Sequence, residues 1–179
     1  MGAAAGLTLI VQAGVMKIRC SWECLGAAAA LAWSQPRAPG RWRSSARPIA
    51  ALIAAVREAG ADEALMLDVH GFVNTTNACN FFIVRKGAVW TSTGDYCMNG
   101  VTRGKVIEVC RANGIPVFEK NYSLYEAYGA QEAFLTGTFG AQTPVASIDG
   151  KAIGNGIAGP VTRRIRALYE ELVRAETAG

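Results

Sequence analysis

Two stretches of the sequence determine the predicted binding site. They are Asn99-Gly-Val-Thr-Arg-Gly104 and, further along the chain, Gly137-Thr138. Each stretch combines a glycine with a threonine hydroxyl beside the predicted end of a helix or strand. Backbone N–H groups at such ends lack an acceptor within their own element, and they bind phosphate well. Because the chain has a single histidine and no cluster of metal ligands, the two stretches together predict a site for a phosphorylated cofactor.

The sequence around these two stretches alternates predicted strands with predicted helices. A threonine such as Thr102 can cap a helix, and this helix is predicted to run to about Asn113 and to end at Gly114. Asp149-Gly150 is typical of a tight hairpin turn. The other predicted strands are 64–69, 81–84, 88–90, 116–118 and 134–136, with helices at 49–59, 122–130 and 161–176 and a hairpin at 145–153. The predicted fold class is therefore α+β or mixed α/β.

Composition indicates one soluble globular domain, because the 179 residues are 51% hydrophobic and 18% charged. The basic excess lies in the first third of the chain. Residues 1–60 carry seven Lys or Arg and two Glu (7 − 2 = +5), whereas the remainder carries eleven basic and twelve acidic residues (11 − 12 = −1). We therefore expect no nucleic acid to bind the folded body. A basic tail at residues 37–47 is the alternative, and unstructured sequence is the interpretation we prefer.

The five cysteines are odd in number and scattered, which indicates a reducing compartment, and we expect a cytoplasmic protein. Cys20 and Cys24 could supply half of a metal site, but no second pair of ligands accompanies them, so no metal is expected. No apolar run reaches the ~18 residues that a membrane span needs, so no membrane partner is expected either.

Residues 34–48 are rich in proline and arginine and are typical of a linker. The predicted division of the chain is a segment 1–48, disordered or translated from another reading frame, followed by a folded domain at 49–179.

Several motifs within residues 49–177 resemble the class IV, or fold-type IV, pyridoxal-phosphate aminotransferases, which include branched-chain and D-amino-acid aminotransferases. They occur in that family's order and spacing, and together they make the resemblance specific. The matching segments are 60–68, 71–73, 77–84, 99–103, 134–138, 143–145 and 148–150. The resemblance implies the larger C-terminal domain of that fold, with the small N-terminal domain missing.

The resemblance also implies a cofactor, pyridoxal 5′-phosphate, and a set of site residues. Val101 and Thr102 would form one side of the phosphate cup, and Gly137 and Thr138 the other. Thr76 and Asn77 fit the cofactor-binding pattern, and the backbone at Phe139 would receive a substrate carboxylate. The implied partners are an amino acid and a 2-oxo acid, between which an amino group moves, and the implied assembly is a homodimer.

Two departures from the family pattern bear on activity. The family's lysine, which bonds covalently to the cofactor, would fall near Trp42, so no catalytic residue is assigned. Thr75 stands where most relatives have a glutamate that pairs with the cofactor's pyridine nitrogen. Two hypotheses therefore stay open. The first is a truncated transaminase of branched-chain or D-amino-acid type, and the second is an inactive remnant or phosphate-binding module.

Overall fold

A computed structural model describes residues 15–20, 60–137 and 141–178, and for residues 15–20 it describes the backbone alone. The described strands form one sheet in the order β3-β2-β1-β8-β7-β4-β5-β6, with β9 paired to β8. Neighbouring strands are antiparallel except β5 and β6. The bounds are β1 Val15–Cys20, β2 Glu63–Leu67, β3 Val73–Thr76, β4 Asn80–Arg85, β5 Ala88–Thr91, β6 Val117–Glu119, β7 Glu132–Gly137, β8 Ala141–Ile148 and β9 Lys151–Ala152.

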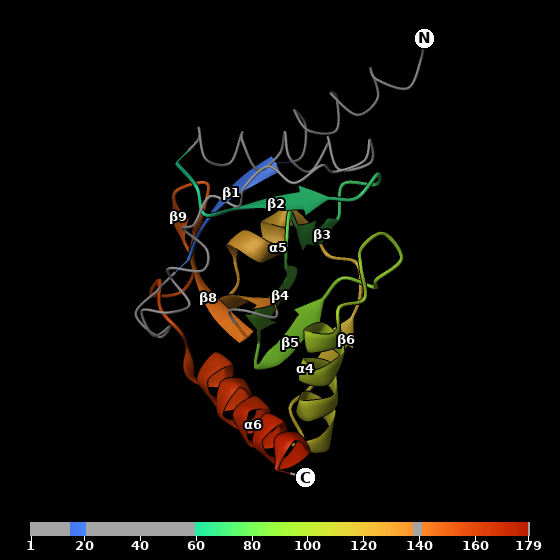
Figure 1. The fold of residues 1–179 in the computed structure, drawn as a ribbon. Helices are drawn as coiled ribbons and strands as arrows, with labels where there is room; N and C mark the ends of the chain where they lie inside the picture. The colour runs from blue at the N-terminus through green and yellow to red at the C-terminus, as the bar shows by residue number, and fades with distance from the viewer. Residues whose placement is uncertain (1–14, 21–59, 138–140, 179) are drawn as a thin grey trace, which may run out of the picture.

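Three described helices cover this sheet from opposite sides (Figure 1): α4 Val101–Ala112, α5 Leu124–Tyr128 and α6 Pro160–Thr177. Alternate residues of β4 explain the two layers. Phe81 and Ile83 pack in a core with Ala127 of α5, whereas Phe82 and Val84 pack in a second core with residues of α4 and α6. Both faces of β4 are therefore buried, which is why its sequence is a continuous apolar run.

The helix starts differ in how their first N–H groups are satisfied. At α5, the Ser123 hydroxyl accepts from the Glu126 amide while the Glu126 carboxylate accepts from the Ser123 amide. At α6, the Glu132 carboxylate of β7 accepts from the amides of Val161 (3.0 Å) and Thr162 (2.8 Å). At α4, the N-cap is Gly100 and no side chain caps the helix. The α4 start is thus the one of these three that keeps its donors available.

The structure confirms the mixed α/β class and most of the predicted elements. The predicted hairpin turn is present, with φ +50° at Asp149 and φ +77° at Gly150. One prediction is wrong: Thr102 does not cap α4, because the helix starts at Val101, two residues earlier than a cap at Thr102 implies, and Gly100 is its N-cap. The helix predicted at 49–59 lies outside the described residues.

Strand β1 is a feature that the sequence did not predict. Its backbone pairs with β2 on one side and with β8 on the other, so it connects strands β3 and β2 with the rest of the sheet. Residues 15–20 of the segment 1–48 thus pair with two strands of the sheet. The rest of that segment lies outside the described residues, and the division at residue 48 stays a prediction.

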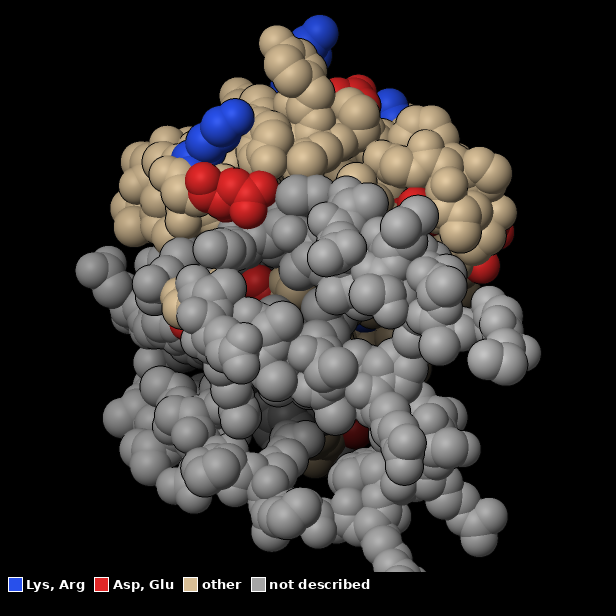
Figure 2. Space-filling model, turned by 90° about the horizontal axis from the view of Figure 1, so that it is seen from above, with Lys and Arg blue, Asp and Glu red and all other residues tan. Residues whose placement is uncertain are grey.

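The face of the molecule that Figure 2 shows carries both signs of charge among the described residues. In the face shown in Figure 2, their Lys and Arg side chains are separated by tan surface and interspersed with Asp and Glu. Among the described residues, no helix is long and apolar enough to cross a membrane, and no three His, Cys, Asp or Glu side chains cluster in a way that could hold a metal ion.

Candidate functional site

The first turn of α4 presents backbone donors. The first intrahelical bond runs from the Gly104 amide to the Gly100 carbonyl (3.0 Å), so the amides of Val101, Thr102 and Arg103 precede it. The first turn contains no acidic residue, and Val101 is 83% exposed. Such an end carries a partial positive charge and attracts anions.

The candidate site has two arms. The first arm is the start of α4, and the second arm is the end of β7. Gly137 is the last residue of β7 and pairs with Ala141, the first residue of β8. A Cβ at Gly137 would lie 3.0 Å from the Cys79 Sγ, so a larger residue would crowd that thiol. Thr138 and Phe139, which were predicted to bind phosphate and substrate, lie outside the described residues, and their roles stay predictions.

The two arms meet at the adjacent residues Cys79 and Asn80. Asn80 pairs directly with Thr136, which precedes Gly137 in β7. On its other side, the Asn80 Oδ1 lies 2.6 Å from the position that a Cβ on Gly100 would occupy. The start of α4 and the end of β7 are therefore brought together over one dipeptide, although 33 or more positions separate them in the sequence.

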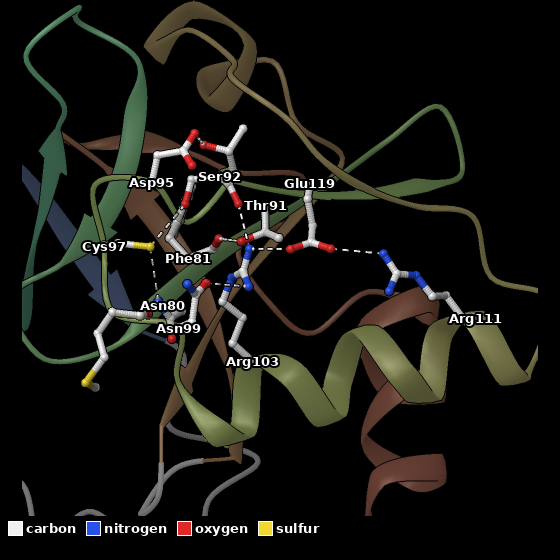
Figure 3. Close-up of polar contacts among 12 residues, drawn as sticks. Asn80, Phe81, Thr91, Ser92, Asp95, Cys97, Asn99, Arg103, Arg111 and Glu119 are labelled. Carbon is white, nitrogen blue, oxygen red and sulfur yellow. Dashed lines mark hydrogen bonds and ion pairs between the residues drawn. The ribbon is translucent and has the colours of Figure 1, made fainter.

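The loop before α4 is held in place by polar contacts, which Figure 3 draws. Asn80 Nδ2 donates to the Met98 carbonyl oxygen (2.8 Å), and the Gly100 amide donates to the same carbonyl (3.0 Å). The Arg103 guanidinium donates to the Asn99 Oδ1 (3.0 Å) and the Ser92 carbonyl (2.7 Å). Glu119 accepts from Arg103 and from Arg111, each at 2.9 Å.

Buried polar groups without a partner lie beside the β7 arm. Thr136 and Gln142 are direct cross-strand partners, so their side chains share one face of the sheet. They are 2% and 0% exposed, and neither the Thr136 hydroxyl nor the Gln142 amide has a hydrogen-bond partner in the described structure. Such groups usually have a water or ligand atom as partner, which makes this end of the sheet suited to a polar ligand.

Thr76 and Asn77 hold the turn between β3 and β4. The Thr76 hydroxyl donates to the Cys79 carbonyl (2.8 Å) and accepts from the Cys79 amide (2.9 Å), and the Asn77 Oδ1 accepts from the Ala64 amide (2.7 Å). The Thr75 hydroxyl also donates to the Cys79 carbonyl (2.8 Å). These side chains shape the turn that supports Cys79 and Asn80, and direct contact of Thr76 and Asn77 with a cofactor stays a prediction.

Glu63 is a buried carboxyl group next to that turn. It is 1% exposed. Burial raises the pKa of Glu63 to about 7, although the nearby polar groups of Thr76, Asn77 and Ala78 act in the opposite direction. The charge of Glu63, after burial itself, also contributes to raising the pKa of the Cys79 thiol to about 12, so that thiol stays protonated at neutral pH.

This raised pKa predicts a pH-dependent stability. An unfolded Glu63 loses its proton near pH 4.5 and the folded one near pH 7, so the folded state binds more protons between these values and stability falls as pH rises. The full effect is about 3 kcal/mol. We expect Glu63→Gln to flatten the dependence between pH 5 and 7, measured by urea unfolding at each pH. An unchanged slope in the variant would contradict the assignment.

The sequence analysis missed Asn80 and Arg103 as site residues. Asn80 directly precedes the predicted strand 81–84, and its cross-strand position cannot be read from one sequence. Arg103 did offer a signal, because a cation in the first turn of a helix opposes the helix dipole and needs a compensating partner. That partner is Glu119, 16 positions away.

Comparisons with known proteins agree with this architecture. The model of the family "Amino-transferase class IV" matches residues 44–148. The branched-chain-amino-acid aminotransferase-like protein 2 of Arabidopsis thaliana is 46% identical over 114 residues, which are 64% of this chain and 20% of that protein. The branched-chain-amino-acid aminotransferase of Pseudomonas aeruginosa is 40% identical over 118 residues, which are 66% of this chain and 38% of that protein.

A solved structure also resembles this chain. An aminotransferase from Brucella abortus, whose crystal structure contains the co-factor PLP, superposes with a TM-score of 0.65 at 33% identity and covers 70% of this chain and 44% of that chain. The chain thus spans less than half the length of each of these three relatives. Because the family model matches more than half of its 179 residues, this chain belongs to the class IV aminotransferases.

Proposed function

We propose that this chain binds pyridoxal 5′-phosphate through the cofactor's phosphate and forms the phosphate-binding part of a transaminase. The amino group would move between an amino acid, of branched-chain or D-amino-acid type, and a 2-oxo acid. The observation that carries the proposal is the meeting of the uncapped α4 start and the β7 end over Cys79 and Asn80.

The residues present fit a phosphate group. The Val101 and Thr102 amides and the Thr102 hydroxyl can donate hydrogen bonds to its oxygens, and no acidic residue in the first turn of α4 repels it. Glycines stand at positions 100 and 137, where a Cβ would crowd Asn80 and Cys79. Thr138 would complete the second arm and the Phe139 backbone would receive the substrate carboxylate, as the family resemblance implies.

The remaining chemistry depends on the cofactor and on groups around its ring. When bound, pyridoxal phosphate supplies an aldehyde that can carry the amino group and a ring that can accept electron density. The family resemblance implies that Thr75 stands at the position that faces the ring nitrogen, and its hydroxyl donates to the Cys79 carbonyl. A neutral hydroxyl in this position cannot balance a protonated ring nitrogen as a carboxylate does.

A second candidate, a phosphate-binding module without amino-group transfer, is favoured by the surroundings of the described lysines. Lys105 pairs with Glu176 (2.6 Å), and the Nζ atoms of Lys120 and Lys151 lie over the rings of Trp90 and Tyr128. Lys86 occupies a turn with φ +51°. Among residues 60–137 and 141–178, Lys105, Lys120 and Lys151 are thus each held by a contact with another side chain.

One experiment separates these functions. The purified chain is mixed with pyridoxal phosphate and reduced with borohydride, and the modified lysine is mapped by mass spectrometry. In parallel, transfer from a branched-chain L-amino acid or a D-amino acid to 2-oxoglutarate is assayed. Transfer with a single trapped lysine supports the transaminase. Cofactor binding without transfer and without a unique trapped lysine supports the module, and no cofactor binding contradicts both.

A further inference from the structure

Arg103 lies one position after Thr102, yet its side chain is bound within the protein. It is 4% exposed, and Figure 3 shows it rising from the first turn of α4 toward Ser92, Asn99 and Glu119. Its Nη1 donates to Asn99, and its Nη2 donates to the Ser92 carbonyl and to Glu119. The guanidinium is therefore bound by protein groups on two segments, the loop 92–99 and β6.

The local energetics of α4 do not explain an arginine at this position. A cation in the first turn opposes the helix dipole, and burial of a charge is costly unless the charge is paired and hydrogen-bonded. A planar guanidinium can hold several acceptors at fixed angles, which an ammonium group cannot. The arrangement is therefore suited to fixing the direction of the α4 start relative to the loop 92–99 and to β6.

The loop that Arg103 holds also reaches the second arm. Beyond Asn99 it contains Met98, whose carbonyl accepts from both Asn80 and Gly100. Asn80 in turn pairs with Thr136, the neighbour of Gly137. The close fit of the loop is also seen at Gly94, which has φ +93° and where a Cβ would lie 2.3 Å from the Asn99 Oδ1.

We propose that Arg103 is the positioning residue of the anion site. It sets the α4 amides at the angle and distance from the β7 end that one phosphate requires, and it does so without contacting the phosphate. This inference rests on the proposed phosphate-binding function. Arg111 provides a matched comparison, because it shares Glu119 with Arg103 but its side chain is 62% exposed and lies in the last turn of α4, away from the helix start.

The test compares binding of pyridoxamine 5′-phosphate with binding of pyridoxamine, which lacks the phosphate. Neither probe has an aldehyde, so surface lysines do not react with it. By calorimetry, Arg103→Met is expected to weaken pyridoxamine 5′-phosphate binding at least tenfold and to leave pyridoxamine binding within twofold. Arg103→Lys keeps the positive charge but not the planar guanidinium, and it is expected to recover part of the lost affinity. Arg111→Met is expected to bind pyridoxamine 5′-phosphate within twofold of wild type.

Amide hydrogen exchange without ligand gives a second, independent readout. In Arg103→Lys, the hydrogen-bonded amides of Gly100 and Gly104 are expected to exchange at least tenfold faster, while those of α6 keep their wild-type rates. If Arg103→Met does not fold, Arg103→Lys decides the question with both measurements. Wild-type binding and wild-type exchange in the folded arginine variants would overturn the positioning role.

The two proposals fail in different ways. If the wild-type chain binds neither probe, the proposed function is wrong, and the exchange measurement alone then judges Arg103. Uniformly faster exchange across α4 and α6 would show a general loss of stability and would also overturn the specific role.

Discussion

Replacing Glu132 with alanine is expected to lower the free energy of unfolding by about 2–4 kcal/mol. Glu132 is 7% exposed, and its carboxylate accepts hydrogen bonds from two backbone amides at the start of α6. Its removal leaves the buried Thr162 amide and the half-buried Val161 amide without that acceptor, and it removes a negative charge from the positive end of an 18-residue helix. Urea unfolding, followed by circular dichroism, measures the change.

A substitution at Gly159, the N-cap of α6, tests the contact of the Glu132 carboxylate from the helix side. A Cβ at Gly159 would lie 2.1 Å from the Glu132 Cδ, so alanine there must displace the carboxylate. We expect Gly159→Ala to destabilise the fold by a similar amount, and the double variant to lose clearly less than the sum. Glu132→Gln keeps an acceptor and is expected to lose less than alanine. A loss below about 0.5 kcal/mol in Glu132→Ala, the size usual for surface substitutions, would contradict this account of α6.

Thr102→Val is expected to weaken pyridoxamine 5′-phosphate binding about 10- to 100-fold, because a hydrogen bond to a charged phosphate contributes about 1.5–3 kcal/mol. Valine has nearly the shape of threonine, and Thr102 does not cap its helix, so stability should change little. Binding is measured by calorimetry and stability by urea unfolding.

A suitable control is Thr177→Val in the last turn of α6. The Thr177 hydroxyl donates to the Val173 carbonyl on the exposed end of α6, far along the chain from either arm. This variant should bind both probes as the wild type does. If Thr102→Val binds pyridoxamine 5′-phosphate with wild-type affinity, the hydroxyl has no part in the phosphate site.

The elements that the sequence predicted well are those whose signal is local. The buried run at Phe81–Val84, the Asp149-Gly150 turn and the periodic Ile165 and Leu168 of α6 each depend on neighbouring residues alone. Class IV membership also followed from motifs that lie along the chain, and the family match confirms it.

Three features that the sequence analysis missed depend on contacts between distant residues. Strand β1 lies between β2 and β8, and no pattern in the sequence Val15–Cys20 indicates which strands it pairs with. The start of α4 was placed at Thr102 because threonine often caps helices, whereas the Gly100 position is set by its contact with Asn80 and Met98. The Arg103–Glu119 pair likewise needs β6 to lie beside α4, which a single sequence cannot show.

The central claim is that the α4 start and the β7 end hold one phosphate together. The most direct test is a titration of the ¹⁵N-labelled chain with pyridoxamine 5′-phosphate, followed by NMR of the backbone amides. The account predicts that Val101, Thr102 and Gly137 shift together with one saturating dissociation constant, and that pyridoxamine leaves them unmoved. Shifts confined to one arm, or different constants for the two arms, would contradict it.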